Sequence, residues 1–196
     1  MARRNEHSLD EIKKMLIEAA ESIIIDQGYS ALTVRKIVIK IGYSVASFYM
    51  VFTNIAGLIR QIKTSTLKEL IQTLRQLPSD SPEQCIQQLA KTYLHFAVND
   101  FNRWSMIYLT DTEPNGEYQQ AINQLHDLLE LEFSRLEPHL SLLQVKQAAR
   151  TLWFSIHGIC SLSLTANSEA RDIEQVENDL VLLVETFMAG WKTIKP

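Results

Sequence analysis

Residues 33–52 read TVRKIVIKIGYSVASFYMVF, and this stretch decides how the N-terminal third of the chain is interpreted. After Thr33, apolar residues recur at the spacing of one helix face: Val34, Ile37, Val38 and Ile41. Gly42 then interrupts the pattern, and Ser44 is a residue type that caps a following helix, which we expect to run through Val51. The stretch predicts two short helices joined by a tight turn that contains glycine.

Two other interpretations of this stretch have to be weighed. Residues 37–41 also alternate as a strand would, but no partner strand is predicted and the segment ends in a helix-start signal. Two short helices, the second burying Phe48 and Phe52 and exposing Ser47, form either a helix-turn-helix or an ordinary helical hairpin in a bundle. The spacing alone leaves both of these helical alternatives open.

Helical patterns continue outward in both directions from this stretch. Before it, an apolar face begins at Leu9, with a capping box of Ser8 and Glu11, and ends at Gly28. Beyond it, six helices are predicted at residues 54–77, 83–100, 102–110, 117–137, 142–166 and 172–193. The segment Pro78–Pro82 reads as a linker. The sequence predicts an all-α protein of about nine helices, three short ones followed by six longer ones.

The composition excludes several classes of protein. Of 196 residues, 46% are hydrophobic and 21% are charged, with only six glycines and five prolines, which argues against disorder and low complexity. Two cysteines without a CxxC or Cys/His cluster predict neither a disulfide scaffold nor a zinc site. No apolar run is long enough to span a membrane, and the N-terminus lacks a signal-type apolar core. We therefore expect a soluble, cytoplasmic protein without a membrane partner.

The charge is spread unevenly over a chain whose net charge is −4. Residues 1–63 hold nine Lys/Arg against six Asp/Glu, whereas residues 64–196 hold ten against seventeen. A mildly basic N-terminal third on an acidic body favours a small head that binds a polyanion.

A resemblance to the TetR family of bacterial transcription regulators chooses between the helical alternatives. Residues 19–52 resemble that family's DNA-binding domain at Ala19, Ala20, Gly28, Tyr29, Thr33, Val34, Ile37, Gly42, Ser44, Ala46, Ser47, Phe48, Tyr49 and Phe52. The resemblance implies a helix-turn-helix domain at residues 1–53 and an effector-binding, dimerising domain at residues 54–196. It also implies a homodimer that places its two third helices in successive major grooves of a double-stranded DNA operator. We expect a one-component regulator, and a repressor rather than an activator.

The resemblance also implies which residues contact DNA. The expected contacts are Thr33, Arg35, Lys36, Tyr43, Ser44, Val45, Ala46, Ser47 and Tyr49. Arg3 and Arg4 could add a flexible arm in the minor groove. The chain departs from the family at several positions. Val38 and Ile41 stand where the family usually has small alanines, Val51 where it usually has His or Tyr on a phosphate, and Ile55 where it often has Lys. Phosphate contacts supply much of DNA affinity, so the apolar Val51 and Ile55 predict either weaker binding or binding that relies more on Arg35, Lys36, Lys40, Tyr43 and Tyr49.

The C-terminal part is similar to the TetR subgroup named for its Trp…His-Gly motif, through Trp153, His157 and Gly158. The expected effector pocket is lined by Phe96, Trp104, Tyr108, Trp153 and His157, and its ligand is a small hydrophobic or amphipathic molecule of unknown identity. His157 can alternatively be a core histidine whose ring nitrogens bond to neighbouring groups.

Two apolar stripes predict how the dimer forms. They run along the last two helices at Val145, Ala148, Ala149, Leu152, Ile156, Val176, Leu180, Leu183, Val184 and Phe187. Two such helices from each chain would build a four-helix bundle around a two-fold axis.

Two rival classes of function remain to be weighed against a regulator. No nucleophile, base and orienting group can be assembled from the spacing, and no metal-ligand cluster is present, so the sequence predicts no catalytic residue, no cofactor and no enzyme. The other rival is a helical adaptor or ligand-binding protein that has weakened or lost DNA binding, as Val51 and Ile55 allow.

Overall fold

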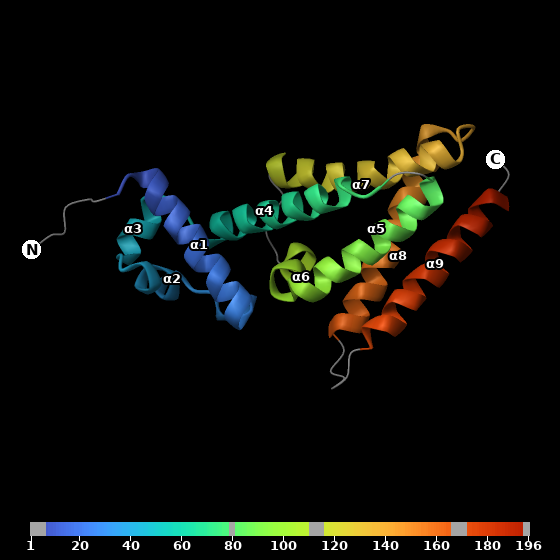
Figure 1. Ribbon diagram of the computed structural model, residues 1–196. Helices are drawn as coiled ribbons and strands as arrows, with labels where there is room; N and C mark the ends of the chain where they lie inside the picture. The colour runs from blue at the N-terminus through green and yellow to red at the C-terminus, as the bar shows by residue number, and fades with distance from the viewer. Residues whose placement is uncertain (1–6, 79–80, 110–115, 166–171, 194–196) are drawn as a thin grey trace, which may run out of the picture. The chain divides into compact units, whose positions relative to one another are not determined.

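Side-chain caps begin several of the described helices, and glycines end two of them. The computed structural model describes residues 7–78, 81–109, 116–165 and 172–193 (Figure 1). In those ranges lie one 3₁₀ turn, η1 (Tyr29–Ala31), and nine α-helices: α1 (Leu9–Gln27), α2 (Val34–Ile41), α3 (Val45–Tyr49), α4 (Ile55–Arg75), α5 (Pro82–Asn99), α6 (Phe101–Leu109), α7 (Gly116–Leu136), α8 (Leu142–Thr165) and α9 (Ile173–Thr193). The all-α prediction is confirmed, and the limits of the six longer helices lie within two residues of those predicted.

The predicted end of the third helix is corrected by the structure. Helix α3 ends at Tyr49 with Met50 as its C-cap, whereas the sequence predicts it through Val51. The Val51 amide donates to the Phe48 carbonyl at 3.0 Å, which is a tighter turn than an α-helix makes. The tightening brings Phe52 back toward the core of its unit, where it is buried.

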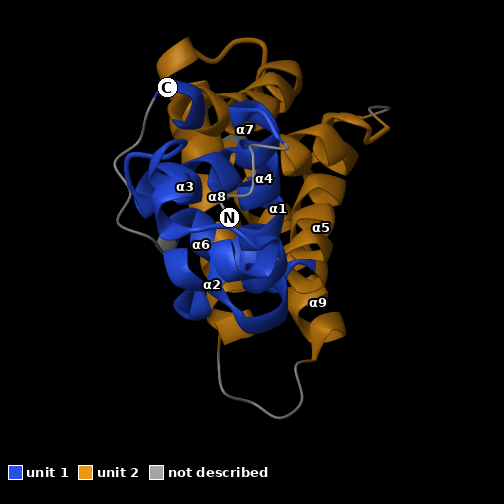
Figure 2. Ribbon diagram, turned by 90° about the vertical axis from the view of Figure 1, so that its left-hand side faces the viewer, with its two compact units in different colours: residues 1–66, 100–118 blue, residues 67–99, 119–196 orange. Residues whose placement is uncertain are grey.

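The chain packs as two compact units, which Figure 2 shows in different colours. Unit 1 comprises residues 1–66 and 100–118, and unit 2 comprises residues 67–99 and 119–196. Helices α4 and α7 therefore contribute to both units. The functional division expected between residues 53 and 54 stays a prediction. The predicted arm at Arg3 and Arg4 and the middle of the predicted linker, residues 79–80, lie outside the described residues.

Unit 1 is organised around α1. The predicted capping box is present, because the Ser8 amide donates to the Glu11 carboxylate at 2.7 Å and the Glu11 amide donates to Ser8 Oγ at 3.3 Å. At the other end, Gly28 stops the helix with φ of 79°. Helix α6 packs on α1, and the side-chain amide of Asn102 in α6 donates to the backbone carbonyl of Ile25 in α1 at 2.9 Å. Residues 77 positions apart are thus brought into one unit.

The core of unit 1 is apolar and draws on α1, α2, α3, α4 and α6. Its larger buried side chains are Leu16, Ile24, Ile37, Phe48, Phe52, Leu58, Ile62 and Met106. Phe48 is fully buried although α3 is only five residues long. Because so short a helix is unstable by itself, this anchor holds α3 in place.

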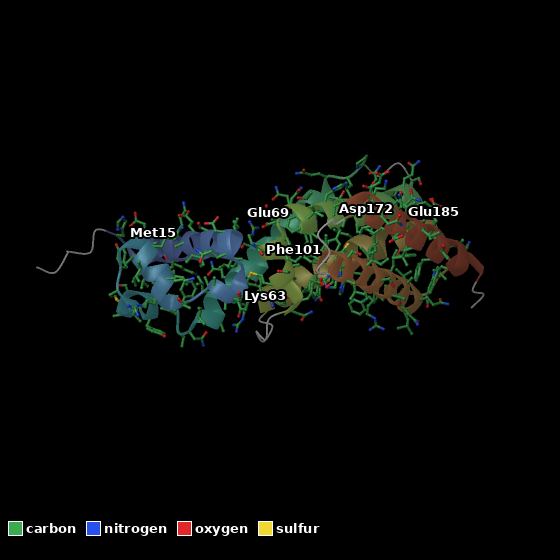
Figure 3. The ribbon with its side chains drawn as sticks, turned by 90° about the horizontal axis from the view of Figure 1, so that it is seen from below. Met15, Lys63, Glu69, Phe101, Asp172 and Glu185 are labelled. Carbon is green, nitrogen blue, oxygen red and sulfur yellow. The ribbon has the colours of Figure 1, made fainter. Side chains whose placement is uncertain are left out.

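Unit 2 is built on contacts of α9 with α5 and α8. Polar pairs join α5 to α9, where the Lys91 ammonium lies 2.6 Å from the Glu177 carboxylate and the Gln87 amide donates to Glu185 at 3.2 Å. The Asp172 carboxylate caps α9 by accepting from the Gln175 amide at 3.0 Å. Figure 3 labels Asp172, directly before α9, and Glu185, within it.

The residues predicted to form the dimer stripes are placed differently by the structure. Most of them are buried inside the single chain: Val145, Ala148, Ala149, Leu152, Ile156, Val176, Leu180 and Val184. Buried side chains form the interior of unit 2 and cannot also form a contact between two chains. This part of the sequence-based prediction is wrong, because an apolar stripe marks a buried face without saying what buries it.

The anchoring role of Phe48 can be tested by truncation. We expect Phe48→Ala to lower the free energy of unfolding by about 3–5 kcal/mol, because it removes a fully buried aromatic side chain. The matched control is Met50→Ala, two residues away and 61% exposed, for which we expect a change below about 0.5 kcal/mol. Urea unfolding followed by circular dichroism measures both variants, and equal losses would contradict the anchoring role.

Candidate nucleic-acid interface and effector region

The turn between α2 and α3 has a defined backbone geometry. Gly42 adopts the left-handed conformation, with φ of 74° and ψ of 27°. Its amide donates to the Ile39 carbonyl at 3.1 Å and the Tyr43 amide donates to the Val38 carbonyl at 2.9 Å. These two bonds are the Schellman motif, in which a glycine ends a helix without the steric penalty that a Cβ would bring. The turn sets the direction in which α3 leaves α2.

Hydroxyl side chains cap the N-termini of α2 and α3. Thr33 Oγ1 accepts from the Lys36 amide at 3.2 Å, and Ser44 Oγ accepts from the Ser47 amide at 3.2 Å. The Ser44 and Ser47 hydroxyls also lie 3.0 Å apart, within hydrogen-bond distance. Thr33, Ser44 and Ser47 were predicted to contact DNA, and the structure shows each of them engaged at a helix start.

Burial separates the two faces of α3. Phe48 is fully buried, as the sequence predicts, whereas Tyr49 is 57% exposed and Val45 is 44% exposed. Ser44 and Ala46 are also exposed, and Ser47 is half-buried. The exposed residues form a continuous outer surface of apolar, hydroxyl and phenol groups, which can contact base edges and accept or donate hydrogen bonds.

Helix α2 contributes the positive charge of this region. Arg35, Lys36 and Lys40 are all exposed. The Lys36 ammonium donates to the Gln27 side chain at 3.0 Å, which ties it to the end of α1. The predicted Tyr43 is half-buried, and its hydroxyl lies 2.7 Å from His7 Nδ1. Neither His7 nor Gln27 was selected from the sequence, because each is far along the chain from its partner.

Two of the departures from the family have a structural role. Val51 and Ile55 are partly buried and pack against the apolar core of unit 1. These side chains therefore add to the stability of the unit and bring no charge or donor to its surface.

The residues expected to line an effector pocket fall in both units. Phe96, Trp153 and His157 belong to unit 2, whereas Trp104 and Tyr108 belong to unit 1. Trp153 and Trp104 are each 1% exposed, Phe96 and His157 are half-buried, and Tyr108 is 37% exposed.

Within unit 2, the structure joins Trp153 and His157 through Tyr93. The Tyr93 hydroxyl lies 2.7 Å from His157 Nδ1, and the Tyr93 and Trp153 ring centroids are 4.6 Å apart. Burial lowers the pKa of the His157 imidazole, which favours its neutral form. Tyr93 is not among the predicted site residues, because its bond to His157 crosses 64 positions and no local signal could reveal it.

The structure offers little for metal or thiol chemistry. Among the described residues, no group of three or more His, Cys, Asp or Glu side chains could hold a metal ion. Cys85 and Cys160 are buried, and burial raises the pKa of the Cys160 thiol to about 12, so it stays protonated at neutral pH. No helix in the described part of the chain has the length and apolar character that crossing a membrane requires.

Comparisons with known proteins cover both parts of the chain. The family model for bacterial regulatory proteins of the tetR family matches residues 16–62, and the model for the tetracyclin repressor-like C-terminal domain matches residues 86–183. No curated protein matches the chain significantly.

Solved structures with a similar fold include several regulators. The chain is similar to PfmR, a TetR-family regulator from Thermus thermophilus, with 14% identity, 87% of this chain and 97% of that chain covered, and a TM-score of 0.64. It is similar to a TetR variant from Acinetobacter baumannii AYE in complex with minocycline, with 13% identity, 92% and 96% coverage and a TM-score of 0.69. It is also similar to BioQ bound to its double-stranded DNA operator, with 17% identity, 90% and 98% coverage and a TM-score of 0.66.

At these identities the solved structures establish the fold alone. The family models add the assignment, because the C-terminal model spans half of the chain and the N-terminal model spans the helix-turn-helix. Members of this family are DNA-binding transcription regulators without enzymatic activity. The chain belongs to the tetR family of bacterial regulatory proteins.

Proposed function

We propose that this DNA-binding regulator is a homodimeric repressor, released from a double-stranded operator by a small hydrophobic or amphipathic effector. The observation that carries the proposal is the outer surface of α3, where Tyr49 and Val45 are exposed while Phe48 anchors the helix from behind. A short helix held this rigidly and backed by the cations of α2 fits the major groove. BioQ, which shares the fold, was solved on its operator.

The proposed contacts divide by chemistry. Arg35 and Lys36 contact the phosphate backbone, with Thr33 at the start of the same helix. Ser44, Val45, Ala46, Ser47 and Tyr49 lie at base edges or phosphates, and Tyr43 lies at the backbone. Val45 can contact thymine methyl groups but cannot read guanine as an arginine does, so the operator leans toward A·T pairs.

The homodimer is proposed from an exposed apolar surface on the last two helices. Phe154 and Leu162 of α8 are 57% and 76% exposed, and Leu182 of α9 is 64% exposed. Gly158 lies between the first two on the same helix face, and a Cβ built there meets nothing within 4 Å. A mid-helix glycine costs about 1 kcal/mol against alanine, so its presence suits a close approach from outside the chain. Two copies of this surface can form an isologous four-helix bundle.

The effector is proposed to bind beside the Tyr93, Trp153 and His157 cluster of unit 2. A tyrosine hydroxyl and a neutral imidazole give polar contacts within an apolar surround, which is the composition of a small-molecule site. We keep Phe96 of the same unit as a further proposed contact, and the likeness to the Trp…His-Gly subgroup as a prediction. The expected contacts Trp104 and Tyr108 lie in unit 1 and stay predictions from the sequence. A cytoplasmic location is part of the same proposal, because the protein has to reach DNA to act on it.

The rival function, an adaptor without DNA binding, rests on Val51 and Ile55. This rival function is refuted if the wild-type chain enriches a specific duplex from a random double-stranded library. It is supported if no duplex is enriched.

The salt dependence of DNA binding tests the proposed phosphate contacts. We expect Arg35→Ala to reduce the slope of log K against log salt concentration by about 0.9 per protomer, because one phosphate charge is no longer neutralised. Tyr49→Ala should weaken binding and leave the slope unchanged, since a phenol carries no charge. The control is Lys14→Ala, whose exposed cation lies on α1 and pairs with Glu18. Fluorescence anisotropy with the selected duplex measures all three variants, and an equal slope change for Lys14→Ala would contradict the assignment.

The dimer surface is tested by placing a charge on it. Leu162→Glu should convert the dimer to monomer at micromolar concentration, because a carboxylate would be buried in the apolar contact. Leu131→Glu is the matched control, since Leu131 is 58% exposed but lies on α7. Sedimentation velocity reports the oligomeric state. A wild-type monomer, or dissociation by the control alone, would refute the proposed interface.

Effector binding and DNA binding should be coupled. A compound from an amphipathic panel that raises the unfolding temperature is expected to weaken operator binding, and the operator should weaken binding of that compound by the same factor. His157→Ala should reduce affinity for the compound, whereas His139→Ala, at an exposed histidine after α7, should not. Isothermal titration with and without the duplex gives both factors. Operator affinity that the compound leaves unchanged, or a loss caused equally by both variants, would contradict the proposal.

A further inference from the structure

His7 and Tyr43 form a contact that the proposed function does not yet use. His7 Nδ1 and the Tyr43 hydroxyl lie 2.7 Å apart, and the two ring centroids are 6.2 Å apart at 60°. His7 directly precedes the cap of α1, and Tyr43 lies in the turn that precedes α3. One hydrogen bond therefore joins the start of the first helix to the turn of the helix-turn-helix, across 36 positions of sequence.

Both partners are held by their local structure. The Tyr43 backbone is fixed by the hydrogen bond that its amide donates to the Val38 carbonyl, and the Tyr43 ring packs against the core of unit 1. The His7 backbone leads into the reciprocal bonds of Ser8 and Glu11. The two side chains are therefore held at hydrogen-bond distance from each other, and what can still vary is the direction in which the Tyr43 hydroxyl points its proton.

The chemistry of the pair decides what Tyr43 can offer a ligand. A phenol has one proton to donate and can also accept, and an imidazole nitrogen donates or accepts depending on the tautomer. If the His7 Nδ1 proton is donated to the Tyr43 oxygen, the Tyr43 proton is left for a third group. In the opposite arrangement, that proton is donated to His7. A phosphate oxygen only accepts, so the first arrangement is the one that suits a DNA backbone.

We propose that His7 is a positioning residue for DNA binding, which donates to the Tyr43 hydroxyl and so directs the Tyr43 proton at a backbone phosphate next to α3. This inference rests on the proposed placement of Tyr43 at the DNA. It adds to the interface a residue from before the first helix. Because a hydroxyl neutralises no phosphate charge, the contact contributes affinity without steepening the salt dependence.

The test is a double-mutant cycle on the full-length chain, with the duplex that the wild type selects from a random library. His7→Ala and Tyr43→Phe should each lower affinity about tenfold per bound protomer, as expected for one hydrogen bond to a charged group. The double variant should bind no more weakly than Tyr43→Phe alone, because both changes remove the same bond. His7→Asn, whose amide can donate from near the position of Nδ1, should recover most of the affinity.

Two further readouts separate positioning from general stability. The salt slope should be the same in all four variants, and the loss should be equal on a scrambled duplex, because phosphate contacts carry no sequence information. His139→Ala serves as the control for removal of an exposed histidine. Wild-type affinity in His7→Ala, multiplied losses in the double variant, or no recovery in His7→Asn would each overturn the proposal. A wild type that selects no duplex is a different result, because it refutes operator binding itself before any variant is compared.

Discussion

The left-handed backbone at Gly42 is the constraint on which the helix-turn-helix depends. With φ of 74°, the chain can close the two bonds that end α2 and start toward Ser44 within three residues. The direction of α3 follows from that turn, and the burial of Phe48 then holds the helix in this direction. A five-residue helix has too few internal bonds to persist alone, so its geometry comes from the turn and the core together. The outer face of α3 is therefore set by the turn at Gly42 and by the burial of Phe48.

The polar groups around α3 are organised by the same scaffold. Ser44 and Ser47 serve the helix start, Lys36 is tied to Gln27, and Tyr43 meets His7. Each of these side chains would reach DNA from a backbone that is already ordered, which reduces the entropy lost on binding. Val51 and Ile55 have a different effect, because their side chains pack against the core and offer no charged group to a phosphate. The proposed interface is therefore modest in charge.

Local signals in the sequence predicted most of the fold and only part of the candidate site. Ser8, Thr33 and Ser44 cap helices as predicted, and Phe48 and Phe52 are buried as their spacing indicates, because capping and periodicity act over a few residues. The bonds of His7 to Tyr43 and of Tyr93 to His157 were missed, since each joins residues that share no local pattern. The dimer stripes failed for a related reason, because an apolar periodicity marks burial and does not distinguish the chain's own core from a partner. The effector residues stay a prediction, since they fall in both compact units.

We propose that the outer face of α3, with the turn before it, meets the DNA. A crystal structure of the protein on its selected duplex tests this most directly. In that complex we expect Tyr49 and Val45 against the major groove and the Tyr43 hydroxyl within hydrogen-bond distance of a phosphate oxygen. Val51 and Ile55 should still pack in the core of unit 1. A complex in which Tyr49 faces solvent while another surface of unit 1 contacts the duplex would contradict it.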